Sequence, residues 1–249
     1  MSEPFDILAF SPHPDDAELG CSGALILAAD RGIRVMIADV SEGDRSSRGT
    51  PGQRDRERKK AGELIGLCNR VSLGLPDSEI GANPNHRLPL IELIRETKPR
   101  VILSPSLSDR HPDHAATGKL VQKAFFYAGV AAVGTGRPHR PEQLFYYMIH
   151  HPFQPSFVLD ISSVWKKKMA ILSAYDSQFQ SDGTGFETPI SQPEFMRFVE
   201  ARAIWFGAMI GTDYGEPYLA PGPVPLRELP GIGPRDQLKG ARPSYCMFT

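Results

Sequence analysis

Two short segments, far apart in the chain, carry the side chains that could do chemistry. The first is Pro12-His13-Pro14-Asp15-Asp16, which places one imidazole beside two carboxylates, and the second is Arg110-His111-Pro112-Asp113-His114. Zinc in hydrolases usually takes three protein ligands, imidazole nitrogens and carboxylate oxygens among them, and keeps a fourth position for water. His13, Asp16 and His114 supply such a set.

The remaining groups of the two segments suggest acid–base roles. Asp15 lies next to a ligand on a tight turn, which leaves its carboxylate free to act as a general base towards a metal-bound water. His111 and Asp113 allow two interpretations. They are either surface residues of a polar loop, or Asp113 holds His111 as a protonated imidazole that stabilises an oxyanion and donates a proton to the leaving amine. We favour the second, because His114 is in the same loop.

The first segment lies between a predicted strand and a predicted helix. The apolar run at residues 5–10 is typical of a buried strand, and residues 17–29 have apolar side chains at helical spacing. The turn between them would lie at the carboxyl end of the strand, where open α/β sheets bind their ligands. In the alternative interpretation, His13 and Asp16 only cap the helix.

The alternation of strand and helix continues through the chain and predicts a Rossmann-like α/β fold. We expect a mostly parallel sheet in the order 3-2-1-4-5 with helices on both faces. The loops after the first and fourth strands then meet at the switch point, which brings the two segments together. The expected strands are 5–10, 33–40, 71–75, 101–104, 144–149 and 157–161, and the expected helices are 17–29, 53–67, 89–97, 115–127, 165–175 and 194–209.

One domain is expected over residues 1–216, followed by an extended C-terminal tail. The chain has 249 residues, enough for one large α/β domain with a proper core. Residues 217–249 are rich in proline and glycine and show no periodicity. They form the C-terminal extension of the predicted fold.

Composition narrows the classes of partner. A net charge of -1 provides no general basic field that would draw the protein to nucleic acid or to a membrane surface. No apolar run approaches the ~18 residues of a membrane span. The three cysteines form no Cys-x-x-Cys pair, and no basic-then-apolar leader precedes the first strand. We therefore expect a cytoplasmic protein with a small-molecule partner.

Four further polar residues could line the same cleft. Glu42, Arg54 and Asp77 follow the second and third strands, and Arg110 lies beside His111. Each could equally be a solvated side chain, and the two arginines could pair with nearby acids such as Glu57 or Asp109.

The two segments resemble those of the LmbE-like, or PIG-L, family of zinc-dependent N-acetylglucosamine de-N-acetylases. The resemblance covers residues 5–218. Within the family it is greatest to the deacetylases that act on N-acetylglucosaminyl-malate in bacillithiol biosynthesis, and it extends to Tyr146-Tyr147-Met148-Ile149 and Ala174-Tyr175-Asp176-Ser177-Gln178-Phe179. Where the family commonly has a glycine pair after the first motif, this chain has Ser22-Gly23.

The resemblance implies one Zn²⁺ per chain, held by His13, Asp16 and His114, with Asp15 as the general base. It also implies that His111 with Asp113 is the electrostatic and acid partner. Substrate-binding positions would fall at Glu42, Arg54, Asp77 and Arg110. A homo-oligomer, either a hexamer or a trimer, is the expected assembly.

These observations predict a hydrolase that removes the acetyl group from N-acetylglucosaminyl-malate and releases glucosaminyl-malate and acetate. A deacetylase or amidase acting on another N-acetylglucosaminyl or sugar-thiol conjugate is an alternative. A nucleotide-binding module of the same fold is a third possibility. It is disfavoured because the first turn lacks Gly-x-Gly-x-x-Gly and presents carboxylates where a pyrophosphate would need backbone amides.

Overall fold

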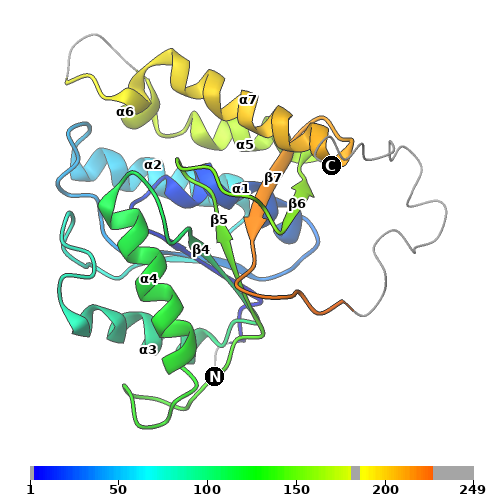
Figure 1. Ribbon diagram of the computed structural model, residues 1–249. Coiled ribbons are helices and arrows are strands. Elements are labelled where there is room, and N and C mark those ends of the chain that lie inside the picture. Colours follow the sequence, from blue (N-terminus) through cyan, green and yellow to red (C-terminus); the bar gives the residue numbers. More distant parts are fainter. Residues whose placement is uncertain (1–2, 181–185, 227–249) are drawn as a thin grey trace.

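A seven-stranded sheet runs through the middle of the protein, in a computed structural model that describes residues 3–180 and 186–226 (Figure 1). The strand order is β3-β2-β1-β4-β5-β7-β6. The first five strands in this order are parallel to one another, which confirms the predicted Rossmann-like order and places the switch point between β1 and β4. The strands are β1 (Ile7–Ser11), β2 (Val35–Asp39), β3 (Asn69–Ser72), β4 (Val101–Pro105), β5 (Gln143–Tyr147), β6 (Phe157–Asp160) and β7 (Gly215–Leu219).

Strand β7 was not expected from the sequence. It runs antiparallel to both β5 and β6, and Pro217 pairs in register with Val158. The many prolines and glycines and the lack of periodicity predict a tail from residue 217, and a proline inside a strand also lacks an N–H to donate. That boundary is wrong, since the sheet continues to Leu219; residues 227–249 of the expected tail lie outside the described part of the chain.

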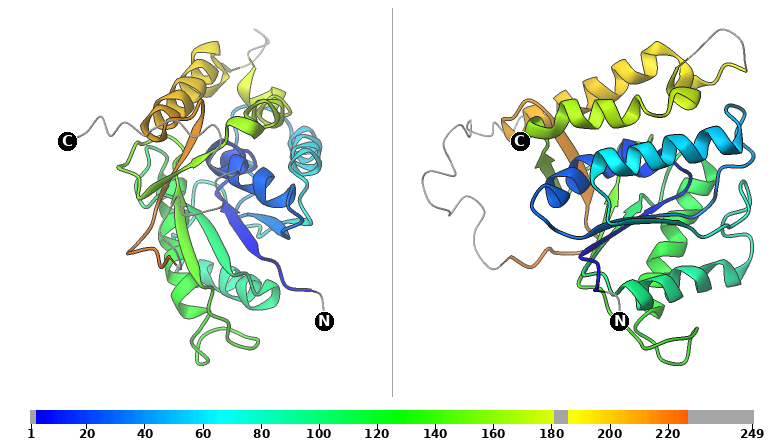
Figure 2. Two further views of the ribbon diagram at one scale, coloured as in Figure 1. Left: turned by 90° about the vertical axis from the view of Figure 1, so that its right-hand side faces the viewer. Right: turned by 180° about the vertical axis from the view of Figure 1, so that it is seen from behind.

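Helices cover both faces of the sheet, and one face carries more of them than the other (Figures 1 and 2). One face carries α3 and α4. The other carries α1 and α2, with α5 packed outside them, while α7 lies directly on β7 and β6 at the end of the sheet. The helices are α1 (Asp16–Ala29), α2 (Pro51–Ile65), α3 (Arg87–Thr97), α4 (Pro112–Tyr127), α5 (Trp165–Leu172), α6 (Asp176–Phe179) and α7 (Pro193–Ile210), with short 3-10 turns η1 (Pro84–His86), η2 (Ser162–Val164) and η3 (Pro189–Ser191).

The central strands are apolar on both sides because each side contacts a helical layer. In β1, Leu8 and Phe10 pack in the core with α3 and α4, whereas Ala9 faces the core with α1 and α2. Strand β2 alternates in the same way. This explains the continuous apolar runs of the sequence, which are typical of parallel strands buried on both faces.

Most elements begin or end a few residues from their expected bounds, and two of the differences have a visible structural cause. The third strand was expected at residues 71–75, but its ladder ends at Ser72, and Gly74 adopts a positive φ of 63°. The helix expected at residues 165–175 ends at Leu172, because Tyr175 turns inwards and donates its hydroxyl to Glu18, at 2.7 Å.

Buried charges fix α1 against the sheet. Arg70 of β3 donates to both carboxylate oxygens of Asp39, at 2.7 and 2.8 Å, and to Glu18 of α1 at 2.5 Å. A buried charge is costly unless it is paired and hydrogen-bonded, and here each charge has a partner of opposite sign. The first turn of α1, which follows the candidate ligands, is therefore held to two strands.

A second buried ion pair holds the middle of α1 from the C-terminal side. Lys168 of α5 lies 2.6 Å from Glu216 of β7 and donates to the carbonyl of Leu19 at 3.0 Å. Both carboxylate oxygens of Glu216 accept backbone N–H groups of α1, from Gly23 and Ala24, at 2.9 Å. A side chain on Gly23 would collide with Glu216, which explains why glycine occupies this position.

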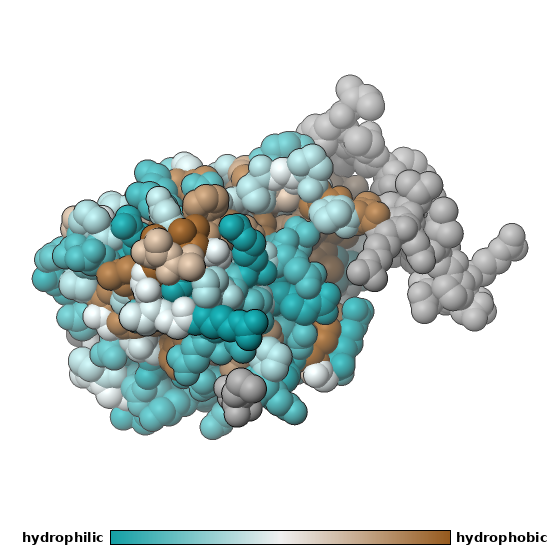
Figure 3. All heavy atoms as spheres, turned by 90° about the horizontal axis from the view of Figure 1, so that it is seen from below, coloured by the Kyte–Doolittle hydropathy of each residue, from teal (hydrophilic) through white to brown (hydrophobic). Residues whose placement is uncertain are grey.

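The surface shows no sign of a membrane span. None of the helices in residues 3–180 and 186–226 is both long and apolar enough to cross a bilayer. Hydrophilic side chains cover most of the face seen from below, and the apolar ones there occur in small separate groups (Figure 3).

Candidate metal centre

The turn after β1 places its polar groups by hydrogen bonds within the turn. The Ser11 hydroxyl donates to the carbonyl of His13 at 2.6 Å and accepts the N–H of Ala17 at 3.0 Å. Asp15 precedes α1 with φ 117°, a conformation that L-residues rarely adopt, and its side chain makes no capping hydrogen bond. Such a conformation persists where the surroundings enforce it, often at functional sites. The first-turn N–H of Ala17 is bound by Ser11, and neither His13 nor Asp16 occupies the N-cap position expected in the capping alternative.

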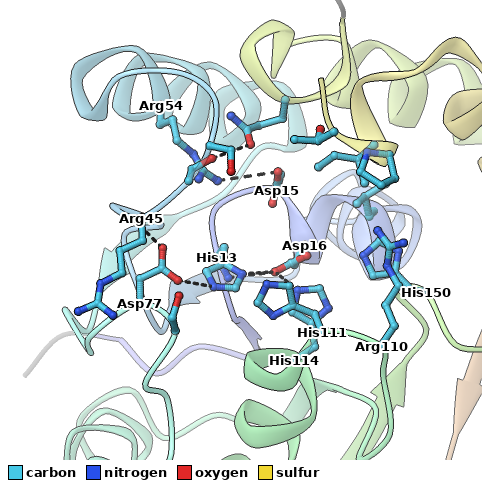
Figure 4. A pocket seen from close by; sticks show the side chains of 18 residues that line it. His13, Asp15, Asp16, Arg45, Arg54, Asp77, Arg110, His111, His114 and His150 are labelled. Atoms are coloured by element: carbon cyan, nitrogen blue, oxygen red, sulfur yellow. Dashed lines mark hydrogen bonds and ion pairs between the residues drawn. The ribbon is translucent and has the colours of Figure 1, made fainter. Parts of the chain in front are cut away.

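Three potential ligand atoms converge above this turn (Figure 4). His13 Nδ1 and His114 Nε2 each lie 3.2 Å from Asp16 Oδ2, and all three residues are buried. They come from the β1–α1 turn and from the first turn of α4, which meet at the switch point. Two imidazole nitrogens and one carboxylate oxygen form the donor set that zinc favours, so the residues fit a metal ion.

The other ring nitrogen of each histidine faces carboxylates. His13 Nε2 lies 3.2 Å from Asp77 Oδ1 and 3.3 Å from Asp113 Oδ2. His114 Nδ1 lies 3.1 Å from Asp109 Oδ1. Metal-binding histidines usually have such a partner, which fixes the ring orientation and tautomer. Both histidines are thus oriented as ligands.

The electrostatics of the cluster favour positive charge at the two imidazoles. Burial alone would lower both pKa values, but hydrogen bonds to Asp113, Asp16 and Asp77 raise the pKa of His13 well above its usual value. The charge of Asp16 and the hydrogen bond to Asp109 raise the pKa of His114 to about 9. A bound cation would take the place of the protons that the two imidazoles share with Asp16.

Asp15 lines the same cavity, and among the described contacts its carboxylate is hydrogen-bonded to neither His13 nor His114. Its pKa is raised to about 8, chiefly by burial and then by the neighbouring charge of Asp16, while Arg54 opposes the rise. The guanidinium of Arg54 lies 3.9 Å from the carboxylate of Asp15. It also donates to the carbonyls of Pro14 at 2.8 Å and Gly43 at 3.1 Å. Arg54 therefore braces the turn that carries Asp15.

The expected contact between His111 and the carboxylate of Asp113 is absent, which corrects the sequence analysis. His111 Nδ1 accepts the backbone N–H of Asp113 at 3.2 Å and so caps α4, whereas the Asp113 carboxylate accepts the N–H of Ser78 at 2.7 Å and faces His13. Burial and the nearby His114 and His13 lower the pKa of His111. With Nδ1 as acceptor, the imidazole is neutral and carries its proton on Nε2.

The cluster lies in an open cavity of about 250 Å³ (Figure 4). Of the four expected substrate-binding residues, Arg54, Asp77 and Arg110 line it. Glu42 does not: it is exposed and lies in a separate hollow beyond Arg54. The lining residues are His13, Asp15, Asp16, Leu19, Arg45, Ser46, Ser47, Arg54, Asp77, Ser78, Arg110, His111, His114, His150, Gln178, Thr188, Pro189 and Ile190.

Several lining residues were missed by the sequence analysis. His150 follows β5, and its ring stacks on that of His114 with centroids 5.4 Å apart. Its position just after a parallel strand of the sheet was an available signal. Residues 188–190 lie at the start of η3, beyond α6, and no motif in the sequence indicates that they reach the cavity.

Comparison with known proteins places the chain in a family. Residues 8–125 match the PIG-L family, described as GlcNAc-PI de-N-acetylase. A crystal structure of a conserved protein, TT1542, from Thermus thermophilus is 38% identical, with a TM-score of 0.81, over 89% of this chain and 97% of the other. A diacetylchitobiose deacetylase from Thermococcus kodakarensis is 27% identical over 93% of this chain and 87% of its own. The chain therefore belongs to the PIG-L family, and it is an enzyme of the amide-hydrolysing deacetylase class.

Two further relatives bear on the substrate. A probable N-acetyl-alpha-D-glucosaminyl L-malate deacetylase 2 from Bacillus subtilis is 32% identical, but over only 48% of this chain and 60% of its own. A 4-oxalmesaconate hydratase from Pseudomonas putida is 26% identical over 69% of this chain and 73% of its own. The similarity that identifies the family is therefore shared by proteins named for different substrates.

Proposed function

We propose that the protein removes the acetyl group from an N-acetylglucosaminyl conjugate, and that the conjugate is N-acetylglucosaminyl-malate. The observation that carries this proposal is the buried donor set of His13, Asp16 and His114, with the carboxylate of Asp15 beside it in an open cavity. The family membership and the partial similarity to a glucosaminyl-malate deacetylase support the choice of substrate.

His13, Asp16 and His114 would hold the metal, and zinc is the proposed ion. A bound zinc supplies Lewis acidity and lowers the pKa of water near it. Asp77 and Asp113 keep the ring of His13 oriented through its second nitrogen. The protein thus prepares the donor set before any substrate arrives.

The side chains around the donor set provide the acid–base steps. Asp15, whose ionised form a nearby bound cation would favour, accepts a proton from the attacking water, whose oxygen bonds to the acetyl carbon. His111 donates from Nε2 to the developing oxyanion, a role that needs a proton on this nitrogen, and Nε2 is free to carry it because Nδ1 accepts the N–H of Asp113. The C–N bond then breaks, the proton held by Asp15 passes to the leaving amine, and acetate and glucosaminyl-malate are released.

Of the two arginines expected to bind the malate carboxylates, Arg110 is better placed. The two terminal nitrogens of Arg54 donate to backbone carbonyls, and the guanidinium faces Asp15. Among the described residues, Arg110 makes no hydrogen bond or ion pair, is exposed and lines the cavity. A free guanidinium at the edge of the cavity can bind a carboxylate with two parallel hydrogen bonds.

The test is release of acetate and free amine from N-acetylglucosaminyl-malate by the metal-loaded protein, beside free N-acetylglucosamine. Both products should appear in equal amounts, and removal of the metal with a chelator should abolish them. Preference for another N-acetylglucosaminyl conjugate would overturn the malate assignment alone. No acetate from any N-acetylated sugar, together with hydration of an unsaturated dicarboxylate, would overturn the deacetylase proposal.

A further inference from the structure

Asp109 makes more contacts around the site than any role so far assigned to it requires. One carboxylate oxygen, Oδ1, lies 3.1 Å from Nδ1 of His114 and accepts the backbone N–H of His111 at 3.0 Å. The other, Oδ2, accepts the backbone N–H groups of His150 at 2.9 Å and His151 at 3.3 Å. The side chain is only 2% exposed.

These contacts join two segments that lie far apart in the sequence. Asp109 and His111 are in the loop between β4 and α4, whereas His150 and His151 follow β5. The rings of His111, His114 and His150 form a stack, with centroids 4.6 Å apart between the first two and 5.4 Å apart between the last two. One carboxylate therefore fixes all three members of the stack, two through the backbone and one through its ring.

The contact with the ring of His114 decides which nitrogen is available. An ionised carboxylate can accept hydrogen bonds but cannot donate them. Nδ1 of His114 must therefore carry the proton that it donates to Asp109. When a metal ion takes the place of the proton between Nε2 and Asp16, Nδ1 keeps its proton for Asp109, and the lone pair of Nε2 is free for the ion. This is the tautomer that a ligand nitrogen requires.

We propose that Asp109 is the positioning residue that sets the tautomer and ring orientation of His114 for metal binding. The inference rests on the proposed role of His114 as a metal ligand, but not on the identity of the substrate. A purely structural alternative exists, in which Asp109 only ties the loop before α4 to the segment after β5. The two differ in what happens to metal affinity when the fold is intact.

The experiment measures zinc affinity of Asp109→Asn by competition with a chromophoric chelator. The variant keeps the size of the side chain, but it has one acceptor oxygen where Asp109 has two, and its amide nitrogen cannot accept a hydrogen bond. Affinity should fall ~10- to 100-fold, the usual effect of removing such a partner. Excess zinc should restore occupancy, and the activity on an N-acetylated sugar that is lost at limiting zinc should return in part. The matched control is Asp160→Asn, whose carboxylate also accepts a backbone N–H, from Ser162 at 2.9 Å, on a strand away from the cavity.

A wild-type measurement keeps the proposal testable if Asp109→Asn does not fold. In zinc-loaded protein, NMR of the imidazole nitrogens should show His114 protonated at Nδ1, slow in exchange with water, and ligated at Nε2. Ligation at Nδ1, or wild-type zinc affinity in folded Asp109→Asn, would overturn the proposal. If the wild-type protein binds no zinc at all, the metal site fails and this inference with it. If it binds zinc but releases no acetate, only the proposed deacetylation fails.

Discussion

At the scale of single residues, the types and spacing of the two motifs predicted which side chains meet, but not which way they face. His13, Asp16 and His114 could be placed because each follows a strand end at the switch point. The partner of Asp113 could not be predicted. Whether its carboxylate faces His111 or His13 depends on the path of residues 77–78, which bring Asp77 and the N–H of Ser78 to the same place.

Asp15 is the residue whose loss should separate chemistry from metal binding. In Asp15→Asn the donor set remains intact, but the amide cannot take up the proton of the attacking water. We expect zinc content to be unchanged and kcat to fall ~10²- to 10⁴-fold. His114→Ala, which removes a proposed ligand, should instead lose the zinc. Full turnover by zinc-loaded Asp15→Asn would mean that another group is the base.

The two cavity arginines should differ in what they contribute. Arg110→Ala should lower kcat/KM for N-acetylglucosaminyl-malate. The loss of transition-state binding free energy should be roughly 1.5–3 kcal/mol, the usual contribution of hydrogen bonds to charged groups. The kcat/KM for free N-acetylglucosamine should hardly change. Arg54→Ala should lower kcat/KM for both substrates by the same factor, because Arg54 supports the turn that carries Asp15. The comparison requires kcat/KM for both substrates on each variant.

Arg45→Ala is the control for this pair. Arg45 also lines the cavity, but its side chain pairs with exposed Glu79 at 3.1 Å, so its loss should not discriminate between the substrates. A selective loss of the malate conjugate in Arg54→Ala, with none in Arg110→Ala, would reverse the assignment.

At the scale of elements, periodicity predicted the parallel half of the sheet and its helices because each is a local pattern. Strand β7 could not be found in this way. It comes from the other end of the chain, contains Pro217, and is held between β5 and β6 by contacts that Glu216 makes with α1 and α5. The same holds for residues 188–190, whose position in the cavity depends on how α6 and α7 pack.

Helix α1 should tolerate no side chain at Gly20. A Cβ there would lie 2.1 Å from the ring of Tyr147, whose hydroxyl is held by the carbonyl of Phe10 at 2.6 Å, so the ring cannot easily move. Gly20→Ala should lower the free energy of unfolding by ~1–3 kcal/mol, as overpacking usually does. Urea unfolding of the metal-free protein measures this.

Gly52→Ala is the matched helical control for Gly20→Ala. Gly52 is exposed on α2, where the nearest atom to an added Cβ would be a flexible arginine end at 3.8 Å. Its stability should be unchanged or slightly higher, since alanine favours a helix more than glycine does. Equal stability of both variants would show that α1 and Tyr147 can move apart.

At the scale of the whole molecule, the buried cluster couples the stability of the metal-free protein to pH. Its central groups bind protons more tightly when folded: the pKa of His114 is raised from 6.5 to about 9 and that of Asp15 from 3.8 to about 8. A group with a raised pKa stabilises the folded state at low pH, and that contribution is lost as pH rises through the folded value. Groups with lowered pKa values, such as Asp77 and His150, change stability only at more acidic pH.

The metal-free protein should therefore become less stable as pH rises from 6.5 to 9. Zinc binds the deprotonated histidines, so the zinc-loaded protein should not follow this fall, and the gap between the two melting temperatures should widen with pH. Thermal unfolding in chelator and in zinc, across this range, measures both. The slope in chelator should be smaller in His114→Ala, which lacks one of the titrating groups. A metal-free melting temperature that rises towards the upper end of the range would mean that the cluster does not hold these protons, and would remove the electrostatic argument for a cation at this point.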